Sequence, residues 1–150
     1  MTEPIQFFVP GIPAPGGSKR VFGIKKGGLY TGRFVVTDMG GQRNKDWRAT
    51  VAQAGELAMR NMQLTPLIGP IRVTFRFVMP RPKYHFNSKG VLRTDAACWH
   101  TTKPDTTKLI RSTEDALKGI CWADDAQICY QNGLKIYGVN PGCYIAITSL

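Results

Sequence analysis

The stretch "KPDTTKLIRSTEDALKGICWADDAQIC" (residues 103–129) joins a helical pattern to half of the acidic side chains of the protein. Apolar residues recur in it at steps of three and four, which predicts an amphipathic helix from about Thr107 to Lys118 that ends at Gly119. The side expected to be buried carries Leu109, Thr113, Ala116, Leu117 and Ile120. Five of the ten Asp and Glu residues fall in this stretch, at Asp105, Glu114, Asp115, Asp124 and Asp125. The predicted helix therefore has acidic residues at both ends.

Two further patterns lie on the N-terminal side of this stretch. From about Asn44 to Met62, apolar residues again recur at helical steps, at Trp47, Val51, Ala54, Ala58 and Met62. The segment "GPIRVTFRFVMP" (69–80) alternates instead. Its two sides carry Ile71, Val73, Phe75 and Phe77 on one and Arg72, Thr74 and Arg76 on the other. We therefore predict a second helix and a half-buried strand.

Shorter segments complete the predicted sheet. "IQFFVPGIPAP" (5–15) begins as a strand and is stopped by Pro and Gly. "AQICYQNGLKIYG" (126–138) predicts a β-hairpin that turns at Asn132-Gly133, and "GCYIAITSL" (142–150) predicts a last strand. The order of elements favours an α+β fold, in which a mixed, mainly antiparallel sheet carries two helices on one face. No repeat or linker divides the chain, so all 150 residues are expected to form a single domain.

The charge of the chain is strongly positive and unevenly spread. The formal net charge is +10, and residues 1–104 carry 16 Lys and Arg against 5 Asp and Glu, whereas residues 105–150 carry 4 against 5. A basic protein of this kind favours a polyanionic partner, because neutralising phosphates releases condensed counterions. A generally basic surface kept for solubility is the alternative. Because the cations occur in clusters with aromatic residues between them, nucleic acid is the preferred partner.

Two segments concentrate these cations. Residues 16–36 are rich in glycine and are expected to form a mobile hairpin or loop that closes on a phosphate backbone. Residues 80–104 show no sustained period, and a connection of this length is uncommon unless it is functional or disordered. Aromatic side chains in the second segment suit stacking on bases, although an ordinary flexible excursion is the alternative. The cations assigned to DNA contact are Lys19, Arg20, Lys25, Lys26, Arg81, Lys83 and Lys103.

Other sequence signals narrow the class of protein. There is no run of about 18 apolar residues and no basic-then-apolar N-terminus, so a cytoplasmic protein with neither a membrane partner nor a small-molecule substrate is expected. Four cysteines are present, at Cys98, Cys121, Cys129 and Cys143. A zinc site shared with His85 and His100 is one interpretation of them. Their spacing favours reduced, mostly buried thiols instead.

The acidic residues at the two ends of the predicted helix allow two interpretations. If a loop or bend brings Asp124 or Asp125 beside Asp105, the repelling carboxylates would favour a hard divalent cation such as Mg²⁺, which accepts substrate phosphate as a further ligand. Such a metal activates water and stabilises the charge at phosphorus during phosphodiester hydrolysis. In the alternative, Asp105 contributes to a helix cap, Asp115 pairs with Arg111, and the Asp-Asp pair forms a turn.

The same stretch resembles the signature of RusA-type Holliday-junction resolvases, the small phage and prophage endodeoxyribonucleases, which is similar to K-P-D-x-D-N-L-x-K…D-A-L…G…DD-x-Q-V. "VPGIPAP" (9–15) and "LKIYGVNPG" (134–142) occur in the same order as in that family. The resemblance implies a homodimer that performs paired, symmetrical, Mg²⁺-dependent hydrolysis of four-way DNA junctions, with Mn²⁺ as a substitute. It also implies a role in phage or prophage DNA recombination, repair or packaging, in the cytoplasm of a bacterial host.

The resemblance assigns roles to individual residues. The family's catalytic and metal-binding aspartates carry over onto Asp105 and Asp125, with Asp124 as the neighbour of Asp125. The basic residue of the motif falls on Arg111 in place of lysine. A cation there would hold the scissile phosphate or the leaving group, although the guanidinium presents a wider fork than an ammonium does.

One departure from the motif concerns the metal. The family's second aspartate is Thr107 here, and a hydroxyl is a poorer Mg²⁺ ligand than a carboxylate. Glu114 and Asp115 lie two turns further along the helix, about 10 Å in rise, so recruitment of Asp124 is the preferred repair. If the metal site is lost, a non-catalytic protein that binds branched DNA on the same fold is the alternative. A nuclease that acts on other structures, such as flaps or RNA, is the third interpretation.

Overall fold

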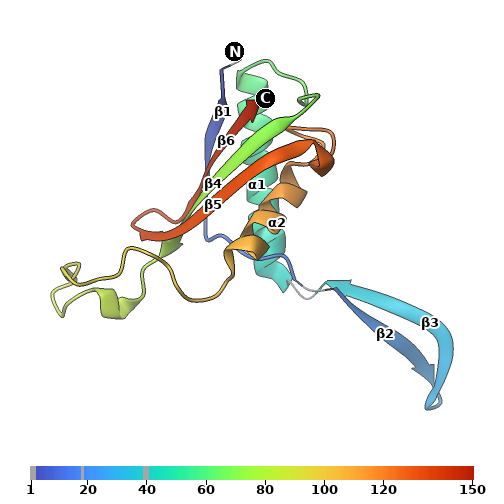
Figure 1. Cartoon of the computed structure of the whole chain (residues 1–150). Helices are drawn as coiled ribbons and strands as arrows, with labels where there is room; N and C mark the ends of the chain where they lie inside the picture. The colour runs from blue at the N-terminus through green and yellow to red at the C-terminus, as the bar shows by residue number, and fades with distance from the viewer. Residues whose placement is uncertain (1–2, 18, 39–40) are drawn as a thin grey trace.

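The computed structural model describes residues 3–17, 19–38 and 41–150, and Figure 1 shows how its elements are arranged. In chain order these are β1 (Ile5–Pro10), β2 (Lys19–Lys26), β3 (Leu29–Asp38), α1 (Gly41–Asn61), β4 (Ile71–Pro80), the short 3-10 helix η1 (Lys83–His85), α2 (Thr106–Leu117), the 3-10 helix η2 (Asp125–Gln127), β5 (Ile128–Gly138) and β6 (Gly142–Ser149). Both α-helices begin and end within three residues of the predicted positions.

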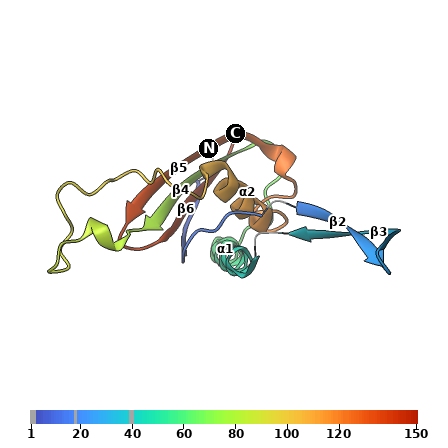
Figure 2. The same ribbon diagram turned by 90° about the horizontal axis from the view of Figure 1, so that it is seen from below.

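Four of the strands form one sheet, in the order β1-β6-β4-β5. Within it β4 and β5 are parallel, whereas the β1–β6 and β4–β6 pairs are antiparallel. Both α1 and α2 cover one face of this sheet, as Figure 2 shows from below. A mixed, mainly antiparallel sheet with two helices on one face confirms the predicted α+β fold.

The core lies between the sheet and these helices. Strand β4 alternates as its sequence predicts, with buried side chains at Ile71, Val73, Phe75 and Phe77. The helices contribute Trp47, Val51, Leu109 and Leu117, all buried. The indole N–H of Trp47 donates to the Thr113 hydroxyl at 3.1 Å, so the polar groups that join α1 to α2 are satisfied inside the core. Packing against the core therefore fixes the position of α2. It also fixes the two ends of the helix, next to which Asp105 and Asp125 lie.

The predicted hairpin turn at Asn132-Gly133 is wrong. Strand β5 runs without interruption through both residues and pairs in parallel with β4. Gly133 has another use, because α2 crosses β5 there: a Cβ on Gly133 would lie 2.6 Å from Cδ1 of Ile110. The glycine thus permits close approach of a helix to a strand, and the chain reverses only after Gly138.

Two segments extend away from the sheet. Strands β2 and β3 form an antiparallel hairpin that projects from the body of the protein as an arm, so the hairpin expected in the glycine-rich segment is present (Figure 1). Residues 81–105 form a second excursion between β4 and α2, irregular as its sequence predicts except for η1. None of the helices described here combines the length and the apolar character that crossing a membrane requires.

Candidate active site

Asp105 lies at the start of α2, but its side chain does not cap the helix. It occupies the N-cap position in an extended conformation, yet its side chain accepts no capping hydrogen bond. An aspartate that caps a helix typically stabilises it by about 1 kcal/mol. Asp105 makes no use of this interaction, and its side chain is exposed to solvent. The carboxylate is therefore available for a ligand, and the interpretation of Asp105 as a cap is not supported.

Lys135 of β5 holds the turn that presents Asp105. Its ammonium donates to the carbonyl oxygens of Thr102 and Pro104, at 2.6 Å in each case. Burial lowers the pKa of Lys135, and the nearby negative charge of Asp105 opposes that shift. The backbone N–H of His100 also donates to the Lys135 carbonyl, at 3.2 Å. This segment therefore runs alongside β5 and is tied to it directly before Asp105.

Sequence reasoning missed Lys135 because it placed the residue just beyond a turn that does not exist. Once β5 is continuous, its side chains alternate between the two faces of the sheet, and Lys135 points to the same side as α2. Its position depends on the parallel pairing of β4 with β5, which no local sequence pattern indicates.

A second acidic group lies at the other end of α2. Asp125 accepts a hydrogen bond from the indole N–H of Trp122 at 2.8 Å. Glu114, in the last turns of α2, accepts one from the side-chain amide of Gln131. Burial, followed by the charges of Asp125 and Asp115, raises the pKa of Glu114 to about 7. Glu114 is thus a neighbour of Asp125, a relation that the sequence did not predict.

Asp124 has a structural role. Its carboxylate caps η2 by accepting a hydrogen bond from the Ala126 N–H at 2.8 Å, and the side chain of Gln127 closes a reciprocal capping box. The ammonium of Lys118 lies 3.4 Å from the same carboxylate. The hydrogen bond from Ala126, and then the charge of Lys118, lower the pKa of Asp124. The turn predicted as the alternative for the Asp-Asp pair is therefore present at this position.

The two acidic groups do not meet within one chain. Helix α2 has twelve residues between them, which corresponds to a length of about 18 Å. In the part of the chain that the structure describes, no three His, Cys, Asp or Glu side chains form a group able to hold a metal ion. The expected approach of Asp124 or Asp125 to Asp105 is therefore absent. The chain turns back before Asp125 only far enough to bring this residue near Glu114, which lies nine residues, or about 13 Å of helical rise, beyond Asp105.

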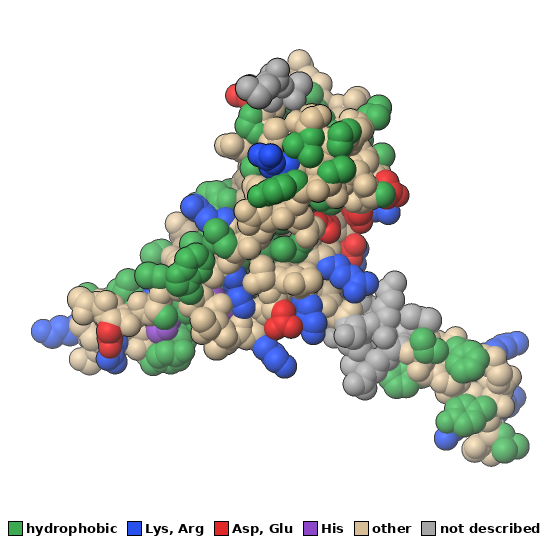
Figure 3. Space-filling view, viewed as in Figure 1, with side chains coloured by type: hydrophobic (Ala, Val, Ile, Leu, Met, Phe, Trp, Pro, Cys, Tyr) green, Lys and Arg blue, Asp and Glu red, His purple; other side chains and the backbone are tan. Residues whose placement is uncertain are grey.

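The exposed side of α2 is divided by charge. Lys108 and Arg111 lie in its first half, and Asp115 lies beyond them with Asp125 past the helix end. Figure 3 shows basic side chains over the first half of α2 and acidic ones gathered at its C-terminal end. Within the described residues, neither Arg111 nor Asp115 forms an ion pair, so the predicted Arg111–Asp115 pair is not seen. Arg111 is exposed and points its charge to solvent.

The cations assigned to DNA contact differ in their solvent exposure and in whether they already bind other groups of the protein. Lys25, Lys26, Lys83 and Lys103 are exposed, and the Lys25 ammonium lies 4.7 Å from the ring centroid of Tyr30 on the arm. Arg81 instead donates to the Ala97 carbonyl at 2.8 Å and contacts the His85 ring, so it holds the second excursion together. Lys19 and Arg20 belong to β2, but their side chains lie outside the described residues.

The cysteines show no sign of a metal site among the described residues. Cys121 and Cys143 are buried, whereas Cys98 and Cys129 are exposed, so the expectation of mostly buried thiols is met by two of the four. Burial raises the pKa of the Cys121 thiol to about 12, which keeps it protonated and unreactive at neutral pH.

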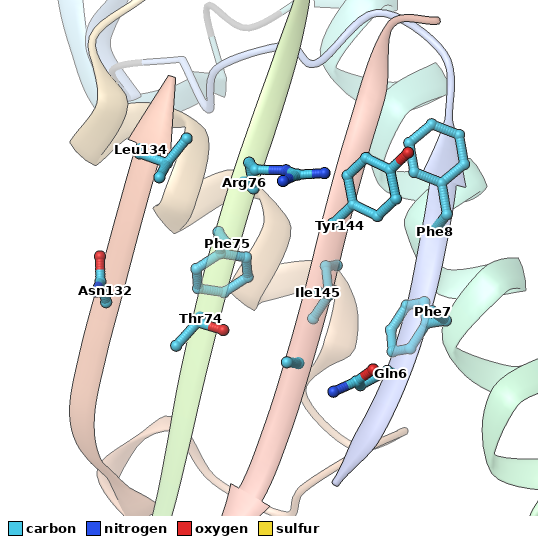
Figure 4. A pocket seen from close by; sticks show the side chains of 11 residues that line it. Gln6, Phe7, Phe8, Thr74, Phe75, Arg76, Asn132, Leu134, Tyr144 and Ile145 are labelled. Atoms are coloured by element: carbon cyan, nitrogen blue, oxygen red, sulfur yellow. The ribbon is translucent and has the colours of Figure 1, made fainter. Parts of the chain in front are cut away.

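The face of the sheet opposite the helices carries a shallow pocket, shown in Figure 4. The Arg76 guanidinium lies over the ring of Tyr144, 4.4 Å from its centroid, and Phe8 packs against the same ring. The residues that line this pocket include no carboxylate. Rings combined with cations in this way suit contact with a flat, anionic ligand such as unpaired nucleotides.

Two comparisons with known proteins bear on this arrangement. Residues 25–148 match the family model described as endodeoxyribonuclease RusA. The matched range includes α2, both acidic groups and Lys135. The chain is also similar to the uncharacterized protein YqaN of Bacillus subtilis (strain 168), with 27% identity over 151 residues that cover 95% of this chain and 94% of that protein.

Proposed function

The chain belongs to the RusA family of endodeoxyribonucleases, and from that premise we propose that it resolves four-way DNA junctions by paired, symmetrical phosphodiester hydrolysis. In each cut, the oxygen of water bonds to phosphorus and the bond from phosphorus to one sugar oxygen breaks. The water's proton leaves with that sugar oxygen, which gives a phosphate monoester and a hydroxyl. Phage or prophage recombination, repair or packaging in a bacterial cytoplasm is the proposed setting.

The observation that carries this proposal is the free carboxylate of Asp105 in a basic surround. Asp105 forgoes its capping role, and a dedicated lysine from another strand holds the turn before it. A helix start that forgoes a cap, and whose approach is fixed by the half-buried Lys135, has more support than the fold alone requires. The Asp105 carboxylate is thereby held where it can contact a DNA backbone that is bound by the surrounding Lys and Arg side chains.

We propose the following roles for the residues of this chain. Asp105 and Asp125 act at the scissile phosphate, and Arg111 offers its fork to the phosphate or to the leaving oxygen. Asp124 is assigned to the support of η2, since its carboxylate already has two partners. Thr107 follows Asp105 in the first turn of α2 and supplies a hydroxyl where the family motif has a carboxylate.

Mg²⁺, with Mn²⁺ as a substitute, is the proposed cofactor, because carboxylates such as the exposed one of Asp105 are the hard oxygen donors that these ions prefer. When bound, such an ion supplies activation of water and stabilisation of negative charge at phosphorus. The described residues of a single chain do not fit the ion as one group, because Asp105 and Asp125 lie at opposite ends of α2.

DNA is proposed to lie across α2, between the arm and the second excursion. The arm presents Lys25 and Lys26 and the excursion presents Lys83 and Lys103, all exposed. The arm and the second excursion flank α2 on two sides, as Figure 1 shows, and a branched DNA offers backbones in more than one direction. Contacts of this kind position the substrate and depend on salt, and they carry little base specificity.

The separation of Asp105 from Asp125 favours one competing function, which is binding of branched DNA without cleavage. The two functions are distinguished by incubating purified protein with a labelled four-way junction and a matched linear duplex, in Mg²⁺ and in EDTA. Metal-dependent paired cuts in the junction, absent in Asp105→Asn, would support the nuclease. Tight junction binding with no cut in Mg²⁺ or Mn²⁺ would leave the binding protein.

A further inference from the structure

We propose that the uncovered face of the sheet is a second DNA-binding surface, which holds a short unpaired segment of a strand by base stacking and phosphate contacts. This face lies on the opposite side of the sheet from α1 and α2, as Figure 2 shows, so it is separate from the candidate active site at Asp105. The inference goes beyond the proposed nuclease function, because binding at this face requires no cleavage.

The charge of this face favours an anionic partner. The four strands that form the sheet are described in full, and none of them contains Asp or Glu. Arg72 and Arg76 of β4 are exposed on the face, and neither forms an ion pair with a described residue. A face with two cations and no carboxylate complements a polyanion such as DNA.

Each of these arginines lies over a tyrosine of a neighbouring strand. The Arg72 guanidinium is 4.7 Å from the ring centroid of Tyr130, its cross-strand partner on β5. The Arg76 guanidinium is 4.4 Å from the ring centroid of Tyr144, its cross-strand partner on β6. The two tyrosines are 48% and 46% exposed, so packing of the core does not account for them. Rings and guanidinium planes at a surface are the groups on which unpaired bases stack.

A hollow begins beside the Arg76–Tyr144 pair and extends over the middle of the sheet. Its floor includes Thr74 of β4 and Ala146 of β6, which are cross-strand partners with small side chains. Its volume is about 490 Å³, within the range of sites that hold small organic groups. Figure 4 shows the Arg76 side chain directed toward Tyr144, with the ring of Phe8 on the far side of that tyrosine.

Polar side chains border the hollow on both edge strands of the sheet. Gln6 of β1 and Asn132 of β5 line it, and both are exposed. Side-chain amides carry donors and acceptors, as the edges of bases do. In a duplex those edges are paired and the base faces are stacked, whereas an unpaired base leaves both available. The combination of rings, amides and cations therefore favours unpaired DNA over a duplex.

The spacing of the two cation–ring pairs sets the length of the bound segment. Arg72 and Arg76 lie four residues apart on one strand, which corresponds to about 13 Å. A stacked strand of DNA advances about 3.4 Å per nucleotide, so this distance matches about four nucleotides. The face thus suits a short single-stranded segment.

Photo-cross-linking of the wild-type chain locates the bound strand. The probe is an oligo(dT) of about 20 nucleotides in which single thymidines are replaced by 5-iododeoxyuridine, used in EDTA so that no cleavage occurs. Mass spectrometry of the digested adducts should identify Tyr130, Tyr144 or Phe8 as the attached residue. Adducts confined to exposed rings elsewhere, such as Tyr30 of the arm or Tyr84 of the second excursion, would overturn the proposal.

Fluorescence anisotropy with the same oligo(dT) in EDTA measures how much the face contributes. Tyr144→Ala and Arg76→Gln should each raise the Kd at least about fivefold, whereas Tyr144→Phe keeps the ring and should stay within about twofold of wild type. Arg60→Gln, an equal loss of charge at an exposed position on α1, is the matched control and should also stay within about twofold. The Kd for a blunt linear duplex should change less than about twofold in all four variants.

A wild-type Kd for oligo(dT) in Tyr144→Ala would overturn the stacking role, and equal losses for oligo(dT) and duplex would show a general basic surface instead. If Tyr144→Ala alters the oligomeric state in sedimentation and leaves the Kd for oligo(dT) unchanged, the face is a contact between copies of the chain. Wild-type protein that binds oligo(dT) at this face but cuts no junction would overturn the proposed nuclease and leave this inference standing.

Discussion

The two ends of α2 use their carboxylates in opposite ways. At the start, Asp105 makes no capping bond and is held in place only through the backbone that Lys135 fixes. At the other end, Asp124 caps η2 and Asp125 accepts a hydrogen bond from Trp122. The sequence presents all three as one acidic cluster. The comparison separates one carboxylate that has no hydrogen-bond partner from two that do, although all three belong to one acidic stretch of sequence.

The same difference predicts how much each carboxylate contributes to the stability of the fold. Loss of Asp105 removes no interaction on which the fold depends, so its replacement should affect chemistry alone. Loss of Asp125 removes a hydrogen bond inside the protein as well. The following predictions test this asymmetry, beginning with the largest expected effect.

Asp105→Asn should reduce the rate of junction cleavage by about 10³-fold or more, because the group proposed to act at the scissile phosphate is lost. Junction affinity should stay the same or rise, since a negative charge near phosphate is removed. Single-turnover cleavage and a gel-shift titration measure the two quantities, with Glu56→Gln of α1 as the control for loss of an exposed carboxylate. Retained cleavage would contradict the assignment of Asp105.

Lys135→Met should slow cleavage about 10-fold, whereas Lys135→Arg should keep most of the activity because it still donates to the two carbonyls. Hydrogen exchange should also increase at the amides of residues 101–106 in Lys135→Met. Lys45→Met serves as the control. If cleavage stays at the wild-type rate while exchange increases, Lys135 only stabilises the segment.

Asp125→Ala should lower the free energy of unfolding by about 1–2 kcal/mol, because the indole N–H of Trp122 loses its acceptor. Asp105→Ala should change it by at most a few tenths of a kcal/mol, and Asp125→Asn should keep most of the stability because its amide oxygen still accepts. Urea unfolding of the three variants compares these values. Equal losses for the two alanine variants would remove the asymmetry between the ends of α2.

Glu114→Gln should remove a pH dependence of stability between about pH 4.5 and 7. The pKa of Glu114 is about 7 in the folded protein and 4.5 ordinarily, so the folded state binds the proton more tightly and stability falls as pH rises through this range. After allowance for solvent screening of a half-exposed group, the effect is about 1 kcal/mol. Urea unfolding at pH 5 and pH 8 in EDTA measures it, and an unchanged pH dependence in the variant would contradict it.

Much of the fold could be predicted from periodicity, and the failures have physical causes. The alternation of apolar and polar residues over 71–77 correctly predicts which side of β4 is buried. The helical pattern before Gly119 correctly predicts where α2 ends. Both features depend on local geometry. Gly133 was misread because a glycine needed for close helix packing looks like one needed for a turn. The sequence holds no sign of that distinction.

The site was predicted less completely for a related reason. Asp105, Asp125 and Arg111 are recognisable from a motif, but the motif orders them along the chain and is silent on their separation in space. Glu114 approaches Asp125 only because the chain folds back after Trp122, and Lys135 approaches Asp105 only because β5 is continuous. Both relations depend on long-range pairing that no local pattern encodes.

The route of the chain from β4 to β5 has a consequence for biosynthesis. These two parallel neighbours are joined by residues 81–127, and that connection contains Asp105, Arg111 and Asp125. Closing so long a loop is entropically costly and slow, and the turn at Asp105 is fixed only when Lys135 of β5 arrives. The proposed cutting site therefore stays incomplete in a nascent chain until β5 has been synthesised and has paired with β4.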